Sequence, residues 1–410
     1  MPIGYLISTG LMATFVLLAV SSHRPRRSSP FRLSYFFGFL INWPLVAFVL
    51  LVASTALAIV QSGVGSPVFW IGLGLAVLAS AGLGVLGRRG RRTTPVVERA
   101  LSEGLGADWR DGVDPELAAR LRRRPSLARI LFAPVLGRHA VERIANVPYG
   151  PAGRRNQLNL YRHRSHPPGC PTLIYLHGGA FRFGGKRFGA RSLLYRLASR
   201  GWVCASANYR LLPAARFPDP LIDVKKAIAW VREHGRDYGA DPTAVFLAGS
   251  SAGGHLASLA ALTPDDPVFQ PGFEDAHTSV AGAISLYGYY GAVASHVPSP
   301  LAYVKTKAPP FFVVHGNQDT LVIVDDARRF VEQLRTTSPN PVVYAELPGA
   351  QHGFDLFRSR RFDAVIDAIE AFTAWVRSAP AKAAPERTRI ADAGAEMIRD
   401  RNAVHPHEVM

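Results

Sequence analysis

Apolar and polar residues follow two different patterns along the chain. The first 92 residues hold three uncharged, strongly apolar stretches at residues 3–20, 36–60 and 68–86. At about 1.5 Å of rise per residue, each stretch spans or nearly spans a hydrocarbon layer of about 30 Å. In lipid the backbone must satisfy its own hydrogen bonds, so we expect these stretches to be helices. The pattern predicts an all-α transmembrane region over residues 1–92.

The second pattern begins at Val141, where short β-rich runs alternate with longer segments of helical periodicity. Alternation of this kind is typical of an α/β layered domain, here predicted over residues 141–378. Two uninterrupted apolar runs, Val245–Ala248 and Phe311–Val314, indicate strands covered on both faces and hence a mostly parallel sheet. Eight strands are expected, at 141–147, 157–161, 172–176, 203–208, 245–248, 281–286, 311–314 and 342–346. Flanking helices are expected at 190–200, 221–238, 254–262, 325–336 and 362–377.

Two segments lie outside these patterns. Residues 93–140 are predicted to form a helical connector or a cap over the domain, between it and the bilayer. A helix is expected to start at Asp114-Pro115-Glu116 and to continue through Leu121 into three arginines at 122–124. Those arginines either contact anionic headgroups or form a solvated helix end. Residues 379–410 are predicted to be a flexible C-terminal tail, with a short helix near 390–401.

The arginines of the first 92 residues predict how the region is oriented. Four lie between the first two stretches, at 24, 26, 27 and 32, and four follow the third stretch at 88, 89, 91 and 92. Basic loops remain in the cytoplasm, so the amino terminus is expected outside and everything after Arg92 inside. Cleavage after the first stretch is the alternative, since Ala19-Val20-Ser21 has the small-x-small form of a signal-peptidase site. The absence of a basic segment ahead of that stretch disfavours cleavage.

Composition excludes several classes of protein. With 48% apolar and 19% charged residues, the chain is not disordered as a whole. The net charge of +17 includes eight arginines from residues 1–92, which contain no acidic residue, so the charge does not form a nucleic-acid-binding stripe. Two cysteines, Cys170 and Cys204, without a C-x-x-C motif or a Cys/His cluster, argue against a disulfide scaffold and against a metal site.

Candidate chemistry is found after the predicted strands. Strand 245–248 leads into Gly249-Ser250-Ser251-Ala252-Gly253, a G-x-S-x-G sequence between a strand and a helix. In such a tight turn the glycines avoid side-chain clashes, and the serine is exposed at the helix amino terminus. The motif predicts Ser251 as a nucleophile and Gly249 and Gly253 as the glycines of its turn. A helix N-cap is the alternative role for Ser251.

An oxyanion site is predicted next to this serine. Strand 172–176 ends in His177-Gly178-Gly179-Ala180. The backbone N–H groups of Gly178 and Gly179, together with that of Ala252, are expected to hold the oxyanion of a tetrahedral intermediate. His177 is expected to stabilise this turn.

A serine hydroxyl needs a base and an orienting carboxylate. Asp319 follows the strand at 311–314 and His352 follows the strand at 342–346. The order Ser251, Asp319, His352 is the one expected of an α/β-hydrolase. Asp325 or Asp326 are alternatives for the acid, and His352 is alternatively a surface histidine. His315 is the other histidine near the acid, and it is expected to be structural. Tyr287, Tyr289 and Tyr290 are expected either to line a substrate pocket or to pack in the core.

Five segments together resemble the bacterial hormone-sensitive-lipase-type carboxylesterases of the α/β-hydrolase superfamily. They are HGGAFRFGG (177–185), NYRLLPAARFP (208–218), GSSAGG (249–254), HGNQDTLV (315–322) and QHGF (351–354). Residues 149–161 are also similar to the neighbouring feruloyl-esterase-like and kynurenine-formamidase-like branch. The oxyanion motif lacks the third glycine of many relatives, and the turn reads GSSAG where GDSAG is common. Neither departure removes a required N–H group.

The resemblance and the motifs together predict a membrane-anchored serine carboxylesterase or lipase. Its expected substrate is a lipophilic ester, its expected partners are that ester and membrane lipids but not nucleic acid, and no cofactor or metal is expected. An amidase, formamidase or peptidase would use the same residues. A catalytically inactive, hydrolase-shaped membrane scaffold is the alternative of another class. The sequence leaves the oligomeric state open.

Overall fold

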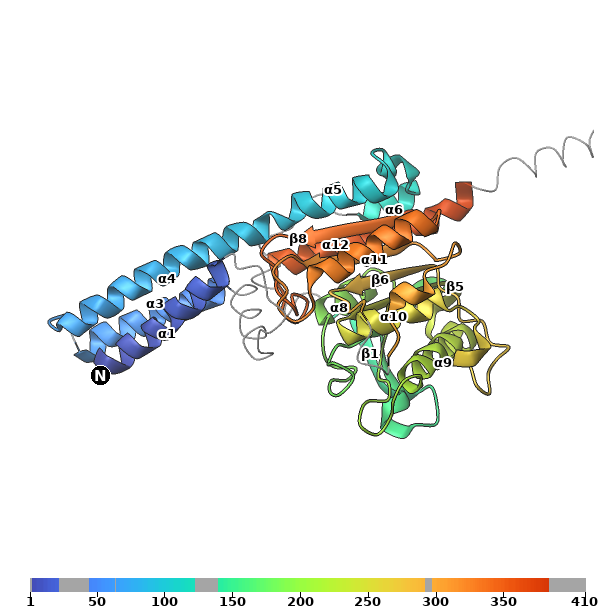
Figure 1. The fold of residues 1–410 in the computed structure, drawn as a ribbon, viewed down its shortest axis with the longest axis horizontal. Helices are drawn as coiled ribbons and strands as arrows, with labels where there is room; N and C mark the ends of the chain where they lie inside the picture. The colour runs from blue at the N-terminus through green and yellow to red at the C-terminus, as the bar shows by residue number, and fades with distance from the viewer. Residues whose placement is uncertain (1, 22–43, 63, 122–138, 292–296, 383–410) are drawn as a thin grey trace, which may run out of the picture.

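The computed structural model describes residues 2–21, 44–62, 64–121, 139–291 and 297–382. Its first part is a bundle of three helices, α1 (Pro2–Val20), α3 (Pro44–Ser62) and α4 (Pro67–Arg91). All three are long and apolar enough to cross a membrane. The helices expected at 3–20 and 68–86 lie within α1 and α4, whereas residues 36–43 of the second expected stretch lie outside the described residues. Figure 1 shows the bundle to one side of a larger α/β domain.

The connector begins as a near-continuous extension of α4. Helix α5 (Thr93–Leu105) follows α4 after one residue, and a short helix, η1 (Trp109–Gly112), and α6 (Pro115–Arg120) come next. Asp114 caps α6 as expected, because its Oδ1 accepts hydrogen bonds from the N–H groups of Glu116 and Leu117 at 2.9 and 3.3 Å. The expected continuation through Leu121 is wrong, since that residue has extended backbone angles. Residues 122–124 lie outside the described part of the chain.

Eight strands form one sheet in the order β1-β2-β4-β3-β5-β6-β7-β8. The two antiparallel pairings are β1 with β2 and β2 with β4, and all the others are parallel. The expected eight-stranded, mostly parallel sheet is therefore confirmed. The strands are β1 (Val141–Pro148), β2 (Gln157–His163), β3 (Cys170–Leu176), β4 (Val203–Ala207), β5 (Ala240–Ser250), β6 (Gly282–Leu286), β7 (Phe311–Gly316) and β8 (Val342–Leu347).

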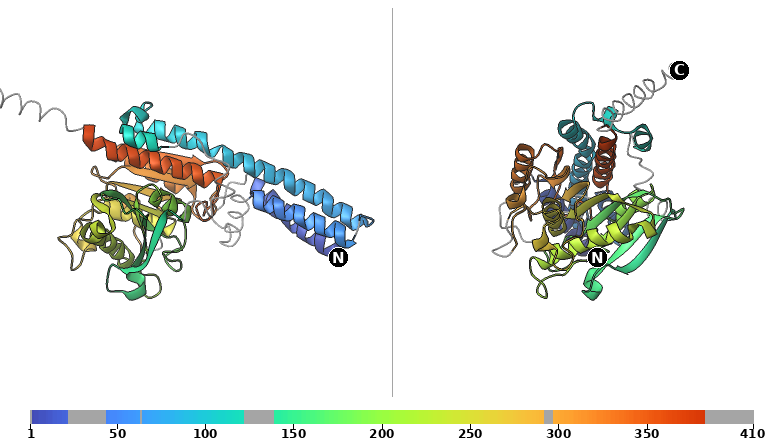
Figure 2. Two further views of the ribbon diagram at one scale, coloured as in Figure 1. Left: turned by 180° about the vertical axis from the view of Figure 1, so that it is seen from behind. Right: turned by 90° about the vertical axis from the view of Figure 1, so that its right-hand side faces the viewer.

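Helices cover both faces of the sheet, as buried strands require. One hydrophobic core contains residues of α9 (Asp219–His234), α10 (Ala252–Leu262) and α11 (Val324–Thr337). The other contains residues of α8 (Arg191–Ala198), α12 (Arg360–Lys382) and α5. Figure 2 shows α5 and α12 side by side on their face of the sheet. All five expected helices are present, and α12 extends four residues into the expected tail. The helix expected at 390–401 lies outside the described residues.

The connector is a layer of this domain. Val97, Ala100, Leu101 and Trp109 are buried in the same core as α12 and β8. Gly104 of α5 lies so close to β8 that a Cβ atom would be 2.8 Å from Cα of Val343. The described part of 93–140 therefore covers a face of the sheet.

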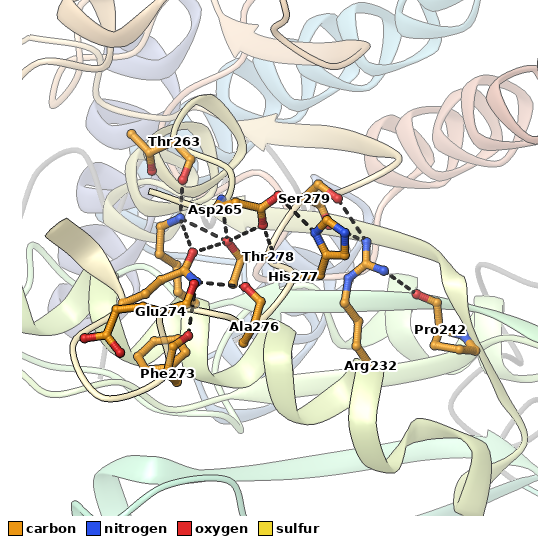
Figure 3. A network of polar contacts seen from close by, with 12 residues as sticks. Arg232, Pro242, Thr263, Asp265, Phe273, Glu274, Ala276, His277, Thr278 and Ser279 are labelled. Carbon is orange, nitrogen blue, oxygen red and sulfur yellow. Dashed lines mark hydrogen bonds and ion pairs between the residues drawn. The ribbon is translucent and has the colours of Figure 1, made fainter. Parts of the chain in front are cut away.

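A buried polar network fixes the segment between α10 and β6 to α9. The Lys225 ammonium of α9 donates hydrogen bonds to the carbonyl of Thr263, to Oγ1 of Thr278 at 3.2 Å and to Oε1 of Gln270 at 3.4 Å. Asp265 accepts a hydrogen bond from the N–H of Thr278 at 2.6 Å, as Figure 3 shows. Burial lowers the pKa of Lys225 to about 8. The network stabilises this loop by replacing the hydration that the buried ammonium has lost.

Candidate active site

The candidate residues gather at one edge of the sheet because each follows the carboxyl end of a parallel strand. Ser251 follows β5, Asp319 lies after β7, His352 lies after β8, and Gly178 and Gly179 follow β3. Parallel strands end at a common edge, where open α/β sheets bind their ligands. Positions 178 and 352, far apart in the chain, thereby come within reach of one another.

The turn at Ser251 is tight and strained. Ser251 has φ 56° and ψ −119°, a conformation unusual for a residue with a side chain. A Cβ atom on Gly249 would lie 2.1 Å from the carbonyl oxygen of Gly253, and one on Gly253 would lie 2.1 Å from that of Leu176. Both positions therefore require glycine, as expected. The turn places the Ser251 hydroxyl at the amino terminus of α10.

A row of hydrogen bonds joins Ser251, His352 and Asp319. Nε2 of His352 lies 2.9 Å from Oγ of Ser251, and Nδ1 lies 2.7 Å from Oδ2 of Asp319. An ionised carboxylate can only accept, so Nδ1 carries the imidazole proton and Nε2 is left to accept the hydroxyl proton. This arrangement can remove a proton from the serine.

The electrostatics of this row favour a charged Asp319. Burial alone would raise its pKa, but electrostatic attraction to His352 and hydrogen bonds from His315 and His352 outweigh burial and hold the pKa well below its usual range. Oδ1 of Asp319 also accepts hydrogen bonds from the N–H groups of Leu321 and Val322 at 2.9 and 2.8 Å. A carboxylate held this firmly orients the imidazole and stabilises its protonated form.

The alternative acids form other contacts. Asp325 pairs with Arg328 at 2.8 Å, and Asp326 pairs with Arg329. Both acids lie on the first turn of α11. The geometry therefore brings Asp319, and neither of these residues, to His352.

The three expected oxyanion groups border the same cavity as Ser251 and His352. Gly178, Gly179 and Ala252 all line it. Gly179 has φ +130°, and a Cβ atom there would lie 2.0 Å from the carbonyl oxygen of Phe183, so this turn requires glycine. Ala252 is the first residue of α10, and the N–H groups of a helix's first turn have no partner within the helix. Its N–H therefore has no acceptor within α10, at a residue that lines the cavity.

The cavity is apolar and has a volume of about 380 Å³. Aromatic and aliphatic side chains form most of its wall, with the serine and the histidine as polar groups. Phe183 at its rim is 45% exposed, which is unusual for so large an apolar side chain. Of the three tyrosines considered from the sequence, Tyr287 and Tyr289 line the cavity, whereas Tyr290 stacks on Phe330 with ring centroids 4.4 Å apart. The apolar wall comprises Phe181, Phe183, Phe188, Tyr287, Tyr289, Leu321, Val322 and Leu356.

Sequence reasoning missed a buried acid beside the histidine. Asp355 accepts hydrogen bonds from the hydroxyls of Ser250 at 2.6 Å, Tyr175 at 3.1 Å and Tyr287. Burial raises the pKa of Asp355. The Tyr287 ring packs edge-on against His352, with centroids 4.5 Å apart. The cluster thus links the serine turn to the histidine loop. Nothing in the sequence distinguished Asp355 from an acid on a surface loop.

The other two histidines of the motifs have structural contacts. Nε2 of His315 donates to the carbonyl oxygen of Val322 at 2.9 Å. The His177 ring stacks on Tyr209, with centroids 4.4 Å apart, and its Nδ1 lies 2.7 Å from the carbonyl oxygen of Gly178. These contacts agree with the structural roles expected for both residues. Within the described ranges, no group of three or more His, Cys, Asp or Glu side chains is placed to hold a metal ion.

The cavity lies on the side of the domain that faces the three-helix bundle. Arg89, near the end of α4, packs on Gly349, two residues past the carboxyl end of β8. Gly104, near the end of α5, packs on Val343 at the other end of that strand. The nearly continuous helices α4 and α5 therefore run antiparallel to β8. The bundle lies beyond the carboxyl edge of the sheet, as Figure 1 shows.

Comparisons with known proteins agree with this geometry. Residues 158–294 match the BD-FAE family, and residues 272–379 match the dienelactone hydrolase family. LipM of Mycobacterium tuberculosis, a probable carboxylic ester hydrolase, is 41% identical over 339 residues, which cover 74% of this chain and 77% of LipM. Esterase LipQ of the same organism is 38% identical over 317 residues, which cover 69% of this chain and 74% of LipQ.

Among solved structures, esterase 2 of Thermogutta terrifontis phosphorylated by paraoxon is similar with a TM-score of 0.50. It is 23% identical to this chain, and the similarity covers 61% of this chain and 95% of the esterase. At this identity the likeness concerns the fold. The expected α/β-hydrolase fold is confirmed.

Proposed function

The chain belongs to the carboxylic ester hydrolases of the α/β-hydrolase superfamily, and from this membership we propose that it is a membrane-anchored serine esterase acting on a lipophilic ester. Ser251 is the proposed nucleophile, His352 the base and Asp319 the orienting acid. The observation that carries the proposal is the hydrogen-bonded row of these three side chains, with spacings of 2.9 and 2.7 Å, beside an apolar cavity.

The proposed mechanism is acyl transfer in two steps. His352 Nε2 takes the Ser251 proton as Oγ attacks the ester carbonyl, and the oxyanion is held by the N–H groups of Gly178, Gly179 and Ala252. Collapse of this intermediate breaks the ester C–O bond, and His352 gives its proton to the leaving alcohol. Water then attacks the acyl-enzyme with the same base, releasing the carboxylic acid and restoring Ser251.

The apolar wall of the cavity supports an acyl chain as its occupant. Each methylene group transferred from water to such a surface contributes about 0.8 kcal/mol, or about fourfold in kcat/KM if the contact persists in the transition state. The exposed Phe183 ring continues this surface to the rim. The position of the rim on the bundle side supports a substrate that enters from the bilayer.

Three apolar helices and the distribution of arginines support anchoring with the amino terminus outside and the catalytic domain in the cytoplasm. An impermeant maleimide tests this orientation, because the two natural cysteines, Cys170 and Cys204, are buried. Gly65→Cys, between α3 and α4, should be labelled in intact cells. Asp108→Cys, after α5, should be labelled only after the cells are opened. The reverse pattern would contradict the orientation.

A panel of esters tests the function. The full chain in nanodiscs should hydrolyse long-chain esters dissolved in the bilayer with a kcat/KM about ten- to a hundredfold above that for an acetyl ester. Ser251→Ala should lose at least 1000-fold in kcat. Equal rates for both esters would contradict the lipophilic substrate, and full activity in Ser251→Ala would contradict the mechanism. Amides of the preferred acids distinguish an amidase, which would cleave them.

A further inference from the structure

Two arginines meet at the loop that leads to His352. Arg361, on the first turn of α12, donates from Nη2 to the carbonyl oxygen of Pro348 at 3.1 Å. Arg89, on the last turn of α4, packs on Gly349, the residue that follows Pro348. A Cβ atom on Gly349 would lie 3.0 Å from Cδ of Arg89. Arg89 of α4 and Arg361 of α12 thus lie on either side of the dipeptide Pro348-Gly349.

Arg361 is buried and Arg89 is half-buried, and neither has a carboxylate partner among the described residues. Arg361 is only 2% exposed. Among the described residues, its Nε and Nη1 atoms have no hydrogen-bond partner, and neither does the buried Nη1 of Arg89. Nη2 of Arg89 donates to the carbonyl oxygen of Val20, at the end of α1, at 2.9 Å. Burial, together with the charge of Arg89, lowers the pKa of Arg361 to about 10, so Arg361 remains cationic at neutral pH.

The rest of α12 shows how this fold normally accommodates buried arginines. Arg196 pairs with Asp367 and, at 2.8 Å, with Glu370, and Arg200 pairs with Glu370 at 2.7 Å. Arg89 and Arg361 lack such a partner within the described chain. Residues 1–97 cannot provide one, since the first acidic residue of the protein is Glu98. Two neighbouring like charges with buried, unused N–H donors are costly unless an anion joins them.

We propose that Arg89 and Arg361 form a binding site for a phosphate-type oxyanion, which joins α4 to α12 beside the His352 loop. Guanidinium groups bind phosphate through paired N–H donors, and the amino terminus of α12 adds the positive end of its dipole. Arg89 follows directly on the apolar part of α4, so a bilayer spanned by α4, as proposed above, would place lipid phosphates at this depth. The anion is therefore either a lipid headgroup or free phosphate. The site is independent of the proposed catalytic residues.

Thermal unfolding of the full chain tests the proposal. The protein is placed in dodecyl maltoside micelles, which contain no phosphate, in phosphate-free buffer, and inorganic phosphate is added at constant ionic strength. A second arm adds phosphatidylglycerol to the micelles and no inorganic phosphate. At a tenfold excess of anion over Kd, Tm should rise by about 3–6 °C. A rise in the first arm identifies free phosphate as a ligand, and a rise in the second identifies the headgroup; either supports the site.

Variants separate the site from general charge effects. Arg89→Met and Arg361→Met should lose the anion-dependent rise in Tm. Arg88→Met, which removes an equal but exposed charge from the adjacent position, should keep it. If Arg361→Met does not fold, Arg89→Met, whose side chain is only half-buried, supplies the comparison. No rise in the unsubstituted chain in either arm, or a rise that survives in Arg89→Met, would overturn the proposal. A lower Tm in Arg361→Met with the rise intact would assign Arg361 a purely structural role.

Discussion

At the scale of single residues, the proposed chemistry depends on which carboxylate reaches His352. The sequence left Asp319, Asp325 and Asp326 as candidates, because all three lie within one loop and the helix start that follows. Only the folded loop shows that Asp319 is buried against the imidazole, whereas the other two pair with arginines of α11. Order along the chain was predictable from motifs, but the direction of a side chain within a loop was not.

Asp319→Asn tests this assignment. An amide can donate to Nδ1 of His352 and so favour the wrong tautomer, so kcat should fall on the order of 10³–10⁴-fold with little change in KM. Asp325→Asn is the matched control, and it should retain activity within about twofold because its partner is the exposed Arg328. Steady-state kinetics on a single ester measures both. Activity lost in Asp325→Asn and kept in Asp319→Asn would identify the other acid.

At the scale of elements, the sequence predicted the sheet well because burial on both faces leaves an unmistakable apolar run. The strand bounds differ from those expected mainly by a few residues at the ends, where hydrogen bonding extends past the apolar run, as at β5. The place of α5 was not predictable. Its three side chains buried in the core with α12 and β8, Val97, Ala100 and Leu101, depend on the fold of residues more than 200 positions away.

Packing between α1 and α4 depends on glycine at particular positions of α4. A Cβ atom on Gly82 would lie 2.3 Å from Cγ1 of Val16, whereas among the described residues nothing lies within 4 Å of one on Gly84. Gly82→Ala should therefore lower the Tm of the bundle by forcing α1 away. Gly84→Ala should leave Tm unchanged or raise it, because alanine favours the helix by up to about 1 kcal/mol. Circular dichroism in nanodiscs measures both, and equal effects would contradict the packing.

At the scale of the whole molecule, two nearly continuous helices, α4 and α5, join the three-helix bundle to the α/β domain. Helix α4 has the composition of a membrane span, and α5 is part of the core of the catalytic domain. This continuity fixes the carboxyl edge of the sheet on the bundle side. The sequence predicted both parts and their order, but not the direction in which the cavity faces, because that direction depends on the register of α5 along β8.

The stability of the molecule should fall on acidification because two histidines are buried in their neutral form. Burial lowers the pKa of His177 and of His255 to about 4. The unfolded chain binds these protons near pH 6.5, so stability is complete above that pH and falls as the pH drops toward 4, by on the order of 3 kcal/mol per histidine. The depressed pKa of Asp319 contributes stability that is fully present above its unfolded pKa near 3.8. This contribution is lost only as the pH falls below that value.

Chemical unfolding between pH 7 and pH 4.5 measures this dependence. His255→Gln keeps a side-chain donor for the carbonyl of Tyr289 and should flatten the pH profile. His234→Gln, at a half-exposed position on α9, should leave the profile unchanged. A profile with the same slope in His255→Gln as in the unsubstituted chain would show that another group titrates.

The most direct test of the central claim is covalent trapping with a fluorophosphonate, followed by peptide mass spectrometry of the full chain. The account predicts a single adduct on Ser251, absent from Ser251→Ala and formed at least 100-fold more slowly in His352→Ala, because the imidazole activates the hydroxyl. A folded chain that forms no adduct, or one that is labelled at another residue, would contradict the claim that Ser251, His352 and Asp319 act together as an esterase.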